Sequence, residues 1–192
     1  MKQTLIKKAF LASVMAGSLL CAGGIDGGTV ISSNGYRTGG FIGVRGAMVF
    51  SIQSSIIGVG DGTYLEDSHD GSGGSFGIQI GGQEGQWRAT LGYEYFDNDE
   101  PQNFDLFFSE VDYFFLENPR AFQPYLGIVG GYLSYETSYA EDSGGFAYGA
   151  SAGVNFNLSD NIDLDLSLRY LFATQDEVDH VGSVNFAINY FY

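Results

Sequence analysis

Residues 182–192, the last eleven of the chain, read G-S-V-N-F-A-I-N-Y-F-Y. A β-strand directs alternate side chains to its two faces. Counted in steps of two, one face of this stretch is wholly apolar and carries Val184, Phe186, Ile188, Tyr190 and Tyr192. The other face is small or polar except near its end, with Ser183, Asn185, Ala187, Asn189 and Phe191. This alternation is typical of a strand that stands between lipid and a polar lumen.

The amino terminus has the parts of a secretory signal peptide. Lys2, Lys7 and Lys8 precede an apolar run over residues 9–20, and small residues follow it. This run is shorter than the roughly 20 residues that a membrane-spanning helix needs, although a retained anchor helix is the alternative. We therefore expect a signal peptide at 1–22, a periplasmic lead at 23–40 and a barrel at 41–192. Cys21 is the only cysteine, so we expect no disulfide and no thiolate metal site in the mature chain.

Composition indicates a folded, β-rich protein. The chain has 29 glycines, three prolines, 44% hydrophobic residues and 16% aromatic residues, which argues against disorder despite a net charge of −15. Nucleic acids are bound largely through Lys and Arg on phosphates, so a nucleic-acid partner is not expected for so acidic a chain.

Eight segments of the chain carry alternating patterns, and the connections between them alternate between long and short. The segments span residues 41–50, 76–81, 87–95, 105–115, 122–135, 146–158, 162–172 and 182–192. The longest connection is 51–73 and the shortest is 159–161. Outer-membrane barrels have long outer loops, short periplasmic turns and both termini on the periplasmic side, whereas a soluble sandwich requires no such order. The sequence therefore predicts an all-β fold, an eight-stranded antiparallel up-and-down transmembrane β-barrel.

Two of these segments are less regular than the others. In 105–115, the apolar residues Leu106, Phe108 and Phe114 fall on the same face as Glu110 and Asp112. The facing of 122–135 is not settled by its pattern.

Several stretches resemble one family. They are F-I-G-V-R-G-A at 41–47, P-Y-L-G-I-V-G-G-Y at 124–132, F-A-Y-G-A-S-A-G-V-N-F at 146–156, L-D-L-S-L-R-Y at 164–170, and the closing strand. Together they resemble the small eight-stranded outer-membrane β-barrels of the OmpA and opacity-protein type. The resemblance implies a bacterial outer-membrane location. It also implies that the closing strand carries the signal read by the barrel-assembly machinery, at Phe186, Ile188, Tyr190 and Tyr192.

Charged residues on the predicted inner faces are the main candidate site. They are Arg45, Arg88, Glu94, Glu110, Asp112, Asp163, Asp165 and Arg169. An eight-stranded barrel is just wide enough for side chains to fill it, and buried charges are costly unless they are paired. We therefore expect a lumen network of ion pairs and trapped water, with a narrow conducting path as the alternative.

Neighbouring charges refine this expectation. Asp163 and Asp165 share a face with Arg169, which argues against a catalytic carboxylate pair. The lumen face of the closing strand has no acid, so Arg45 must find its partner across the lumen, with Glu94, Glu110 or Asp112 as candidates.

The predicted outer loops hold most of the acidic residues. These are Asp61, Glu66, Asp67, Asp70, Asp97, Asp99, Glu100, Glu136, Glu141, Asp142, Asp176, Glu177 and Asp179. They are interpreted as solvated surface charge, and the alternative is a divalent-cation bridge to lipopolysaccharide phosphates, because hard cations take carboxylate oxygens.

A surface enzyme would need a serine and a histidine held together, but His180 and Ser183 are predicted on opposite faces. Trp87 is expected in the periplasmic aromatic girdle. We expect a structural or surface-interaction role through the acidic loops, with a cation-preferring pore and a lipid-modifying enzyme as alternatives. No enzymatic activity, cofactor or metal is predicted, and the expected partners of a monomeric barrel are outer-membrane lipid and lipopolysaccharide.

Overall fold

A computed structural model describes residues 30–31, 36–59, 63–97, 102–116, 122–137, 143–175 and 178–192. The expected signal peptide at 1–22 and most of the lead lie outside these residues. No helix in the described ranges is long and apolar enough to cross a membrane.

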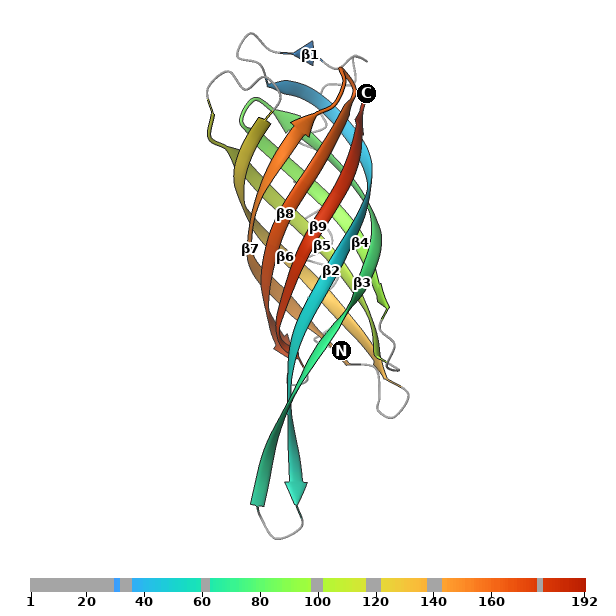
Figure 1. The fold of residues 1–192 in the computed structure, drawn as a ribbon, viewed down its shortest axis with the longest axis vertical. Coiled ribbons are helices and arrows are strands. Elements are labelled where there is room, and N and C mark those ends of the chain that lie inside the picture. Colours follow the sequence, from blue (N-terminus) through green and yellow to red (C-terminus); the bar gives the residue numbers. More distant parts are fainter. Residues whose placement is uncertain are drawn as a thin grey trace, which may run out of the picture.

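Eight long strands form one closed antiparallel barrel (Figure 1). The strands are β2 (Arg37–Val59), β3 (Thr63–Glu84), β4 (Trp87–Asp97), β5 (Gln102–Phe114), β6 (Phe122–Thr137), β7 (Ser143–Asn157), β8 (Ile162–Gln175) and β9 (Val178–Phe191). Each strand pairs with the next, and β9 pairs with β2 to close the sheet. The short strand β1 (Val30–Ile31) pairs with the start of β2, outside this closed ring. The predicted fold class is confirmed.

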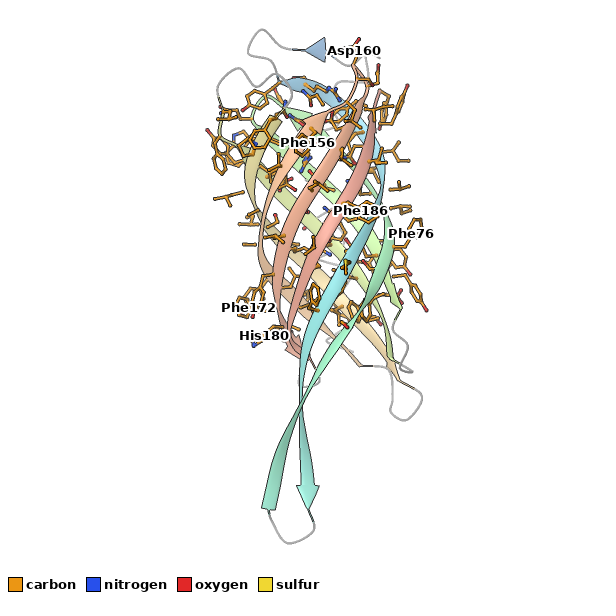
Figure 2. The ribbon with its side chains drawn as sticks, viewed as in Figure 1. Phe76, Phe156, Asp160, Phe172, His180 and Phe186 are labelled. Atoms are coloured by element: carbon orange, nitrogen blue, oxygen red, sulfur yellow. The ribbon has the colours of Figure 1, made fainter. Side chains whose placement is uncertain are left out.

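The outer surface of the barrel is an apolar belt. Phe76 and Phe186 lie at its mid-height, Phe156 lies toward the end that holds the C-terminus, and Phe172 lies toward the opposite end (Figure 2). On β9, Phe186 is 54% exposed whereas Asn185 is 2% exposed, so the predicted alternation of this strand is confirmed. A continuous apolar surface of this kind suits lipid rather than water.

Aromatic side chains gather toward both ends of this belt. Trp87 contacts Tyr113 with ring centroids 4.9 Å apart, next to the short turn at one end, where the aromatic girdle was expected. Tyr148 stacks on Phe172 at 5.8 Å near the other end. Such paired girdles mark the two membrane interfaces of outer-membrane barrels.

The first connection differs from the prediction. Residues 51–73 were expected to form a loop, but the β2–β3 ladder continues from Phe50↔Ser72 to Val59↔Thr63. Pairing of β2 with β9 stops at Ile52, so beyond that point the two strands form a separate ribbon that projects from the end opposite the C-terminus (Figure 1). Each antiparallel residue pair positions the next residues of β2 and β3 to pair as well. β-branched residues such as Ile56 also favour the strand conformation. The glycine and acid content of 51–73 obscured this tendency.

The structure shows which side chains of β6 face the lumen, a question that the sequence pattern left open. Tyr125 and Leu133 point into the lumen, whereas Leu126 and Ile128 are exposed on the outer surface. The three glycines of this strand have no side chain to indicate a face. The irregular strand β5 is also present, with Leu106, Phe108 and Phe114 buried inside the barrel.

An arginine placed on the belt should destabilise the barrel according to its depth. Leu166, in the middle of β8 and opposite Phe186, is 45% exposed on the outer face. Leu166→Arg should therefore cost about 2–4 kcal/mol of unfolding free energy, measured by urea unfolding in lipid vesicles. Leu158→Arg, at the turn between β7 and β8, should cost only about 0–1 kcal/mol because arginine reaches the interface there. Equal losses in the two variants would contradict this membrane register.

Candidate functional site

The lumen is filled by three layers of inward side chains. We call the end from which the β2–β3 ribbon projects the loop end, and the end that holds the C-terminus the turn end. Toward the loop end, eleven buried residues form an apolar plug, in which the exposed fractions run from 0% to 7%. Its members are Ala47, Val49, Phe96, Phe104, Leu106, Phe108, Val129, Leu133, Ala147, Leu171 and Val181. Charged side chains occupy the middle layer. Toward the turn end, Tyr36, Phe114 and Tyr125 form a small aromatic cluster.

Two arginines and two glutamates form the ionic cluster nearest the plug. Arg45 lies 3.3 Å from Glu94 through Nη1 and 3.3 Å from Glu110 through Nη2. Arg169 Nη2 lies 2.5 Å from the other oxygen of Glu94. Both guanidinium groups stand over the Phe108 ring, at 4.8 Å and 5.0 Å from its centroid. The ring therefore stabilises the two cations from the plug side.

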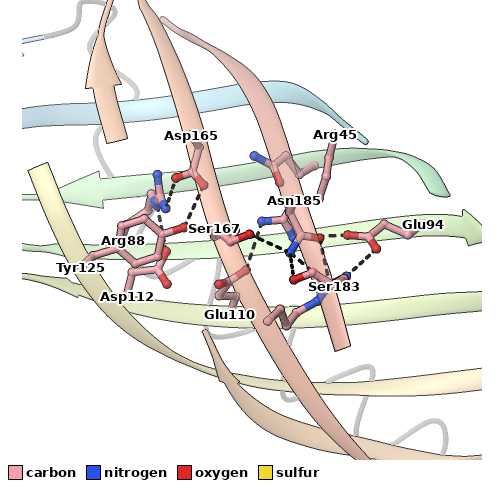
Figure 3. Close-up of polar contacts among 12 residues, drawn as sticks. Arg45, Arg88, Glu94, Glu110, Asp112, Tyr125, Asp165, Ser167, Ser183 and Asn185 are labelled. Carbon is pink, nitrogen blue, oxygen red and sulfur yellow. Dashed lines mark hydrogen bonds and ion pairs between the residues drawn. The ribbon is translucent and has the colours of Figure 1, made fainter. Parts of the chain in front are cut away.

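Arg88 is the centre of a second ionic cluster, closer to the turn end. Its Nε lies 2.8 Å from Asp112 Oδ2, and its Nη2 lies 2.7 Å from Asp165 Oδ2. The Tyr125 hydroxyl donates a hydrogen bond of 2.8 Å to Asp165 Oδ1. The guanidinium also stands over the rings of Phe114 and Tyr125. Figure 3 shows this group at one side of the lumen and Glu94 at the other, with Glu110 between them.

A third ion pair closes the turn end. Arg37 pairs with Asp163 and also donates a hydrogen bond to the Ser159 backbone carbonyl. Asn155 donates a 2.9 Å hydrogen bond to Asp163 Oδ2. The Arg37 guanidinium stands 5.1 Å from the centre of the Phe191 ring. These contacts tie the first residue of β2 to the turn between β7 and β8.

All eight charged residues singled out in the sequence point into the lumen, and each has an ion-pair partner. Arg45 reaches Glu94 and Glu110 across the lumen, whereas Asp112, the third candidate, pairs with Arg88 instead.

Asp163, Asp165 and Arg169 share the lumen face of β8 as predicted, but they do not pair with one another. Asp163 pairs with Arg37, Asp165 pairs with Arg88, and Arg169 pairs with Glu94. Inward residues of one strand stand at different heights, so their charges meet residues of other strands instead of one another.

Sequence reasoning missed two members of the network, Arg37 and Tyr125. Arg37 fell in the expected lead, four residues before the predicted first strand. Steps of two from Arg45 through Gly43, Phe41 and Gly39 reach it, so extending the alternation would have identified it. Tyr125 lies in the strand whose facing the pattern left open.

The lumen face of β9 is neutral, as its sequence indicates. Asn185 donates a 3.1 Å hydrogen bond to Ser183 Oγ, and Gln79 Nε2 donates one of 2.6 Å to Asn189 Oδ1. The opposite face of β9 is exposed, and it carries the residues that the family resemblance assigns to assembly. These are Phe186, Ile188, Tyr190 and Tyr192.

The other candidate residues of the surface do not assemble into a site within the described part of the chain. His180 lies against the rings of Tyr170 and Phe172 on the outer face, whereas Ser183 points into the lumen. Among the described residues, no group of three or more His, Cys, Asp or Glu could hold a metal ion. The side chains of His69 and of all the acidic residues assigned to the outer loops lie outside the described part.

Comparison with known proteins identifies the fold. No protein-family model and no curated protein sequence matches the chain. Neisserial surface protein A has a similar structure, with a TM-score of 0.60 and 18% identity over 80% of this chain and 97% of that one. OprH from Pseudomonas aeruginosa matches with a TM-score of 0.55 and 19% identity over 80% of this chain and 99% of its own. OprG from the same organism matches with a TM-score of 0.50 and 15% identity over 84% of this chain and 100% of its own. The chain therefore has the fold of the small eight-stranded outer-membrane β-barrels.

Removing one carboxylate from the middle layer should destabilise the barrel strongly. Glu94→Gln leaves Arg169 without its carboxylate and Arg45 with Glu110 alone. Breaking a buried ion pair in this way costs about 3–5 kcal/mol, so the urea midpoint should fall markedly. The matched control is Glu84→Gln, because Glu84 is exposed at the end of β3 and should change stability by less than about 0.5 kcal/mol. Similar effects of the two substitutions would contradict a lumen held together by ion pairs.

Proposed function

We propose that this protein is an integral β-barrel of the bacterial outer membrane with a structural or surface-interaction role at its loop end. The exposed apolar belt and its two aromatic girdles support the membrane location, and the fold likeness supports the outer membrane. The observation that carries the role is the filled lumen, because it leaves the outer ends of the strands as the surface available to partners.

The packing of the lumen speaks against the pore alternative. A conducting path needs continuous water through the barrel, and an apolar constriction prevents this by dewetting. Leu106, Phe108 and Leu133 of the plug are 2%, 3% and 0% exposed. Below them, the arginines and carboxylates are bonded to one another, and the turn end is closed by Arg37. An ion would have to displace all three layers.

The loop end offers the larger interaction surface. The β2–β3 ribbon extends beyond the barrel there, and over residues 53–59 and 63–73 each of its strands has one edge outside the barrel pairing. Unpaired strand edges are common sites of protein contact. The acidic residues of the predicted loops are proposed to face the same side, where divalent cations could join them to lipopolysaccharide phosphates.

The remaining partners follow from the barrel itself. The apolar face of β9 is proposed to be read by the assembly machinery during insertion, and the barrel is proposed to act as a monomer in lipid. No observation favours the lipid-modifying enzyme, since His180 and Ser183 lie on opposite faces of β9.

Conductance measurements test this proposal directly. The purified, folded protein should give no steady channels in planar bilayers, because the plug and the ion pairs fill the lumen. A general porin inserted from the same detergent provides the positive control for the bilayer. Steady single-channel currents from the wild-type barrel, at a level that scales with salt, would overturn the closed lumen and favour the cation-preferring pore.

The ribbon should be separable from the barrel. Replacing residues 53–70 by a two-residue turn removes only strand pairs that β2 and β3 make with each other. The shortened protein should therefore fold, with a heat-dependent gel shift and a urea midpoint close to those of the wild type. Failure to form the barrel would show that the ribbon supports the fold and is not a separate surface element.

A further inference from the structure

The two edges of the β2–β3 ribbon differ in length. Pairing of β3 with β4 ends at Gly74, whereas pairing of β2 with β9 ends at Ile52. Within the described part of the chain, no strand pairs with β3 over residues 63–73 on the side away from β2, and none pairs with β2 over 53–59 on its outer side. The edge of β3 is therefore the longer open edge.

The register determines which residues present free backbone groups at these edges. In an antiparallel ladder, the N–H and C=O of one residue point to the same neighbouring strand, and successive residues alternate between the two neighbours. The Phe114 N–H donates to the Gln86 carbonyl, so the odd-numbered residues of β4 point to β3. Because β3–β4 pairs join even to odd residues, the even-numbered residues of β3 point to β4. The Tyr192 N–H donates to the Gly40 carbonyl, so the even-numbered residues of β2 point to β9.

The same alternation continues into the ribbon without a shift of register. Ser54 and Ser68 lie opposite each other there, and both are even-numbered, so their N–H and C=O groups point outward from opposite edges. Such groups can be matched by the backbone of another extended segment. On β3, the residues that present them are Tyr64, Glu66, Ser68, Asp70 and Ser72.

The sequence of the β3 edge indicates the charge of a matching partner. Residues 63–73 contain Glu66, Asp67 and Asp70 but no lysine or arginine. Opposite charges on adjacent strands stabilise their pairing, whereas like charges directly opposite each other destabilise it. A basic segment therefore suits this edge better than a neutral or an acidic one.

A second copy of the chain is a poor partner for the same edge. Two copies in one membrane project their ribbons in the same direction (Figure 1). A two-fold axis along the membrane normal would then bring their β3 edges together in parallel. Parallel pairing is slightly less stable per residue, and here it would place the acidic segment of one copy beside that of the other.

We propose that the β3 edge of the ribbon binds an extended, basic segment of a partner protein, which adds as a further strand beside residues 64–72. Backbone hydrogen bonds to the even-numbered residues supply the affinity, and the acidic residues of 63–73 select the charge. This inference rests on the proposed surface-interaction role and specifies the chemistry of the partner.

Binding of two synthetic peptides to the folded, full-length barrel in an uncharged detergent tests the proposal. Each peptide has about ten residues, which is long enough to span 64–72. One alternates threonine with lysine, and the other alternates threonine with glutamate. Fluorescence anisotropy should show saturable binding of the lysine peptide and none of the glutamate peptide. Equal binding of the two, or no binding of the lysine peptide, would overturn the proposal.

Ser68→Pro and Ser54→Pro form a matched pair of variants, because the two serines share one rung of the ladder and lie on opposite edges. Proline at either position removes an N–H that points away from the ribbon, so β2 and β3 should stay paired. Ser68→Pro should weaken binding of the lysine peptide by about fivefold or more, since one backbone hydrogen bond is lost. Ser54→Pro should leave it unchanged.

Equal affinities of the two variants would overturn the β3 edge as the binding site, since an attraction between charges alone would not distinguish them. The closed lumen is tested separately by conductance. A failure of the peptide experiment would therefore leave the proposed structural role standing, whereas steady channels would contradict that role without bearing on the edge.

Discussion

The hydrogen-bonded pairing of β9 with β2 is the constraint on which the rest of the structure depends. In lipid there is no water to satisfy backbone groups, so a sheet can span the bilayer only if it has no open edge. The pairing from Phe41↔Phe191 to Ile52↔His180 removes the last two edges. Closure with eight strands also sets the lumen width, which is small enough that side chains must fill it.

A narrow lumen decides what its charged residues can do. Four arginines and five carboxylates are held away from bulk water, and their grouping follows where opposite charges can reach across the interior. Aromatic rings on this otherwise polar face contact the guanidinium groups of the arginines. Phe108 lies under both Arg45 and Arg169, so the ring that made β5 irregular in sequence is part of the ionic layer. The interior is thus a packed core of mixed polarity, which suits a structural role better than transport.

The outer belt and the loop end of the barrel differ in the constraints on their residues. The outer belt consists largely of apolar and aromatic residues, a composition that suits contact with lipid. The loop end is free of that constraint, and there the β2–β3 ribbon leaves the barrel and pairs only with itself. Because those ribbon pairs lie outside the closed ring, variation in this region is expected to carry little penalty for the fold.

Much of the fold was determined by the sequence alone. The alternation of 182–192 identified the lipid face and the lumen face of β9, because side-chain direction in a strand is a local property of the backbone. The same period placed Arg88, Glu94, Asp165 and Arg169 inside, and the order of long and short connections indicated the barrel.

Only the tertiary structure decided which charges meet, how β6 faces and where β2 ends. Arg37 and Asp163 are separated by 126 positions, and Arg45 and Glu94 by 49, so no local pattern relates them. The ribbon at 51–73 continues the register that β2 and β3 have inside the barrel. Such contacts depend on the closed ring of strands, whereas the facing of each strand depends only on its own residues.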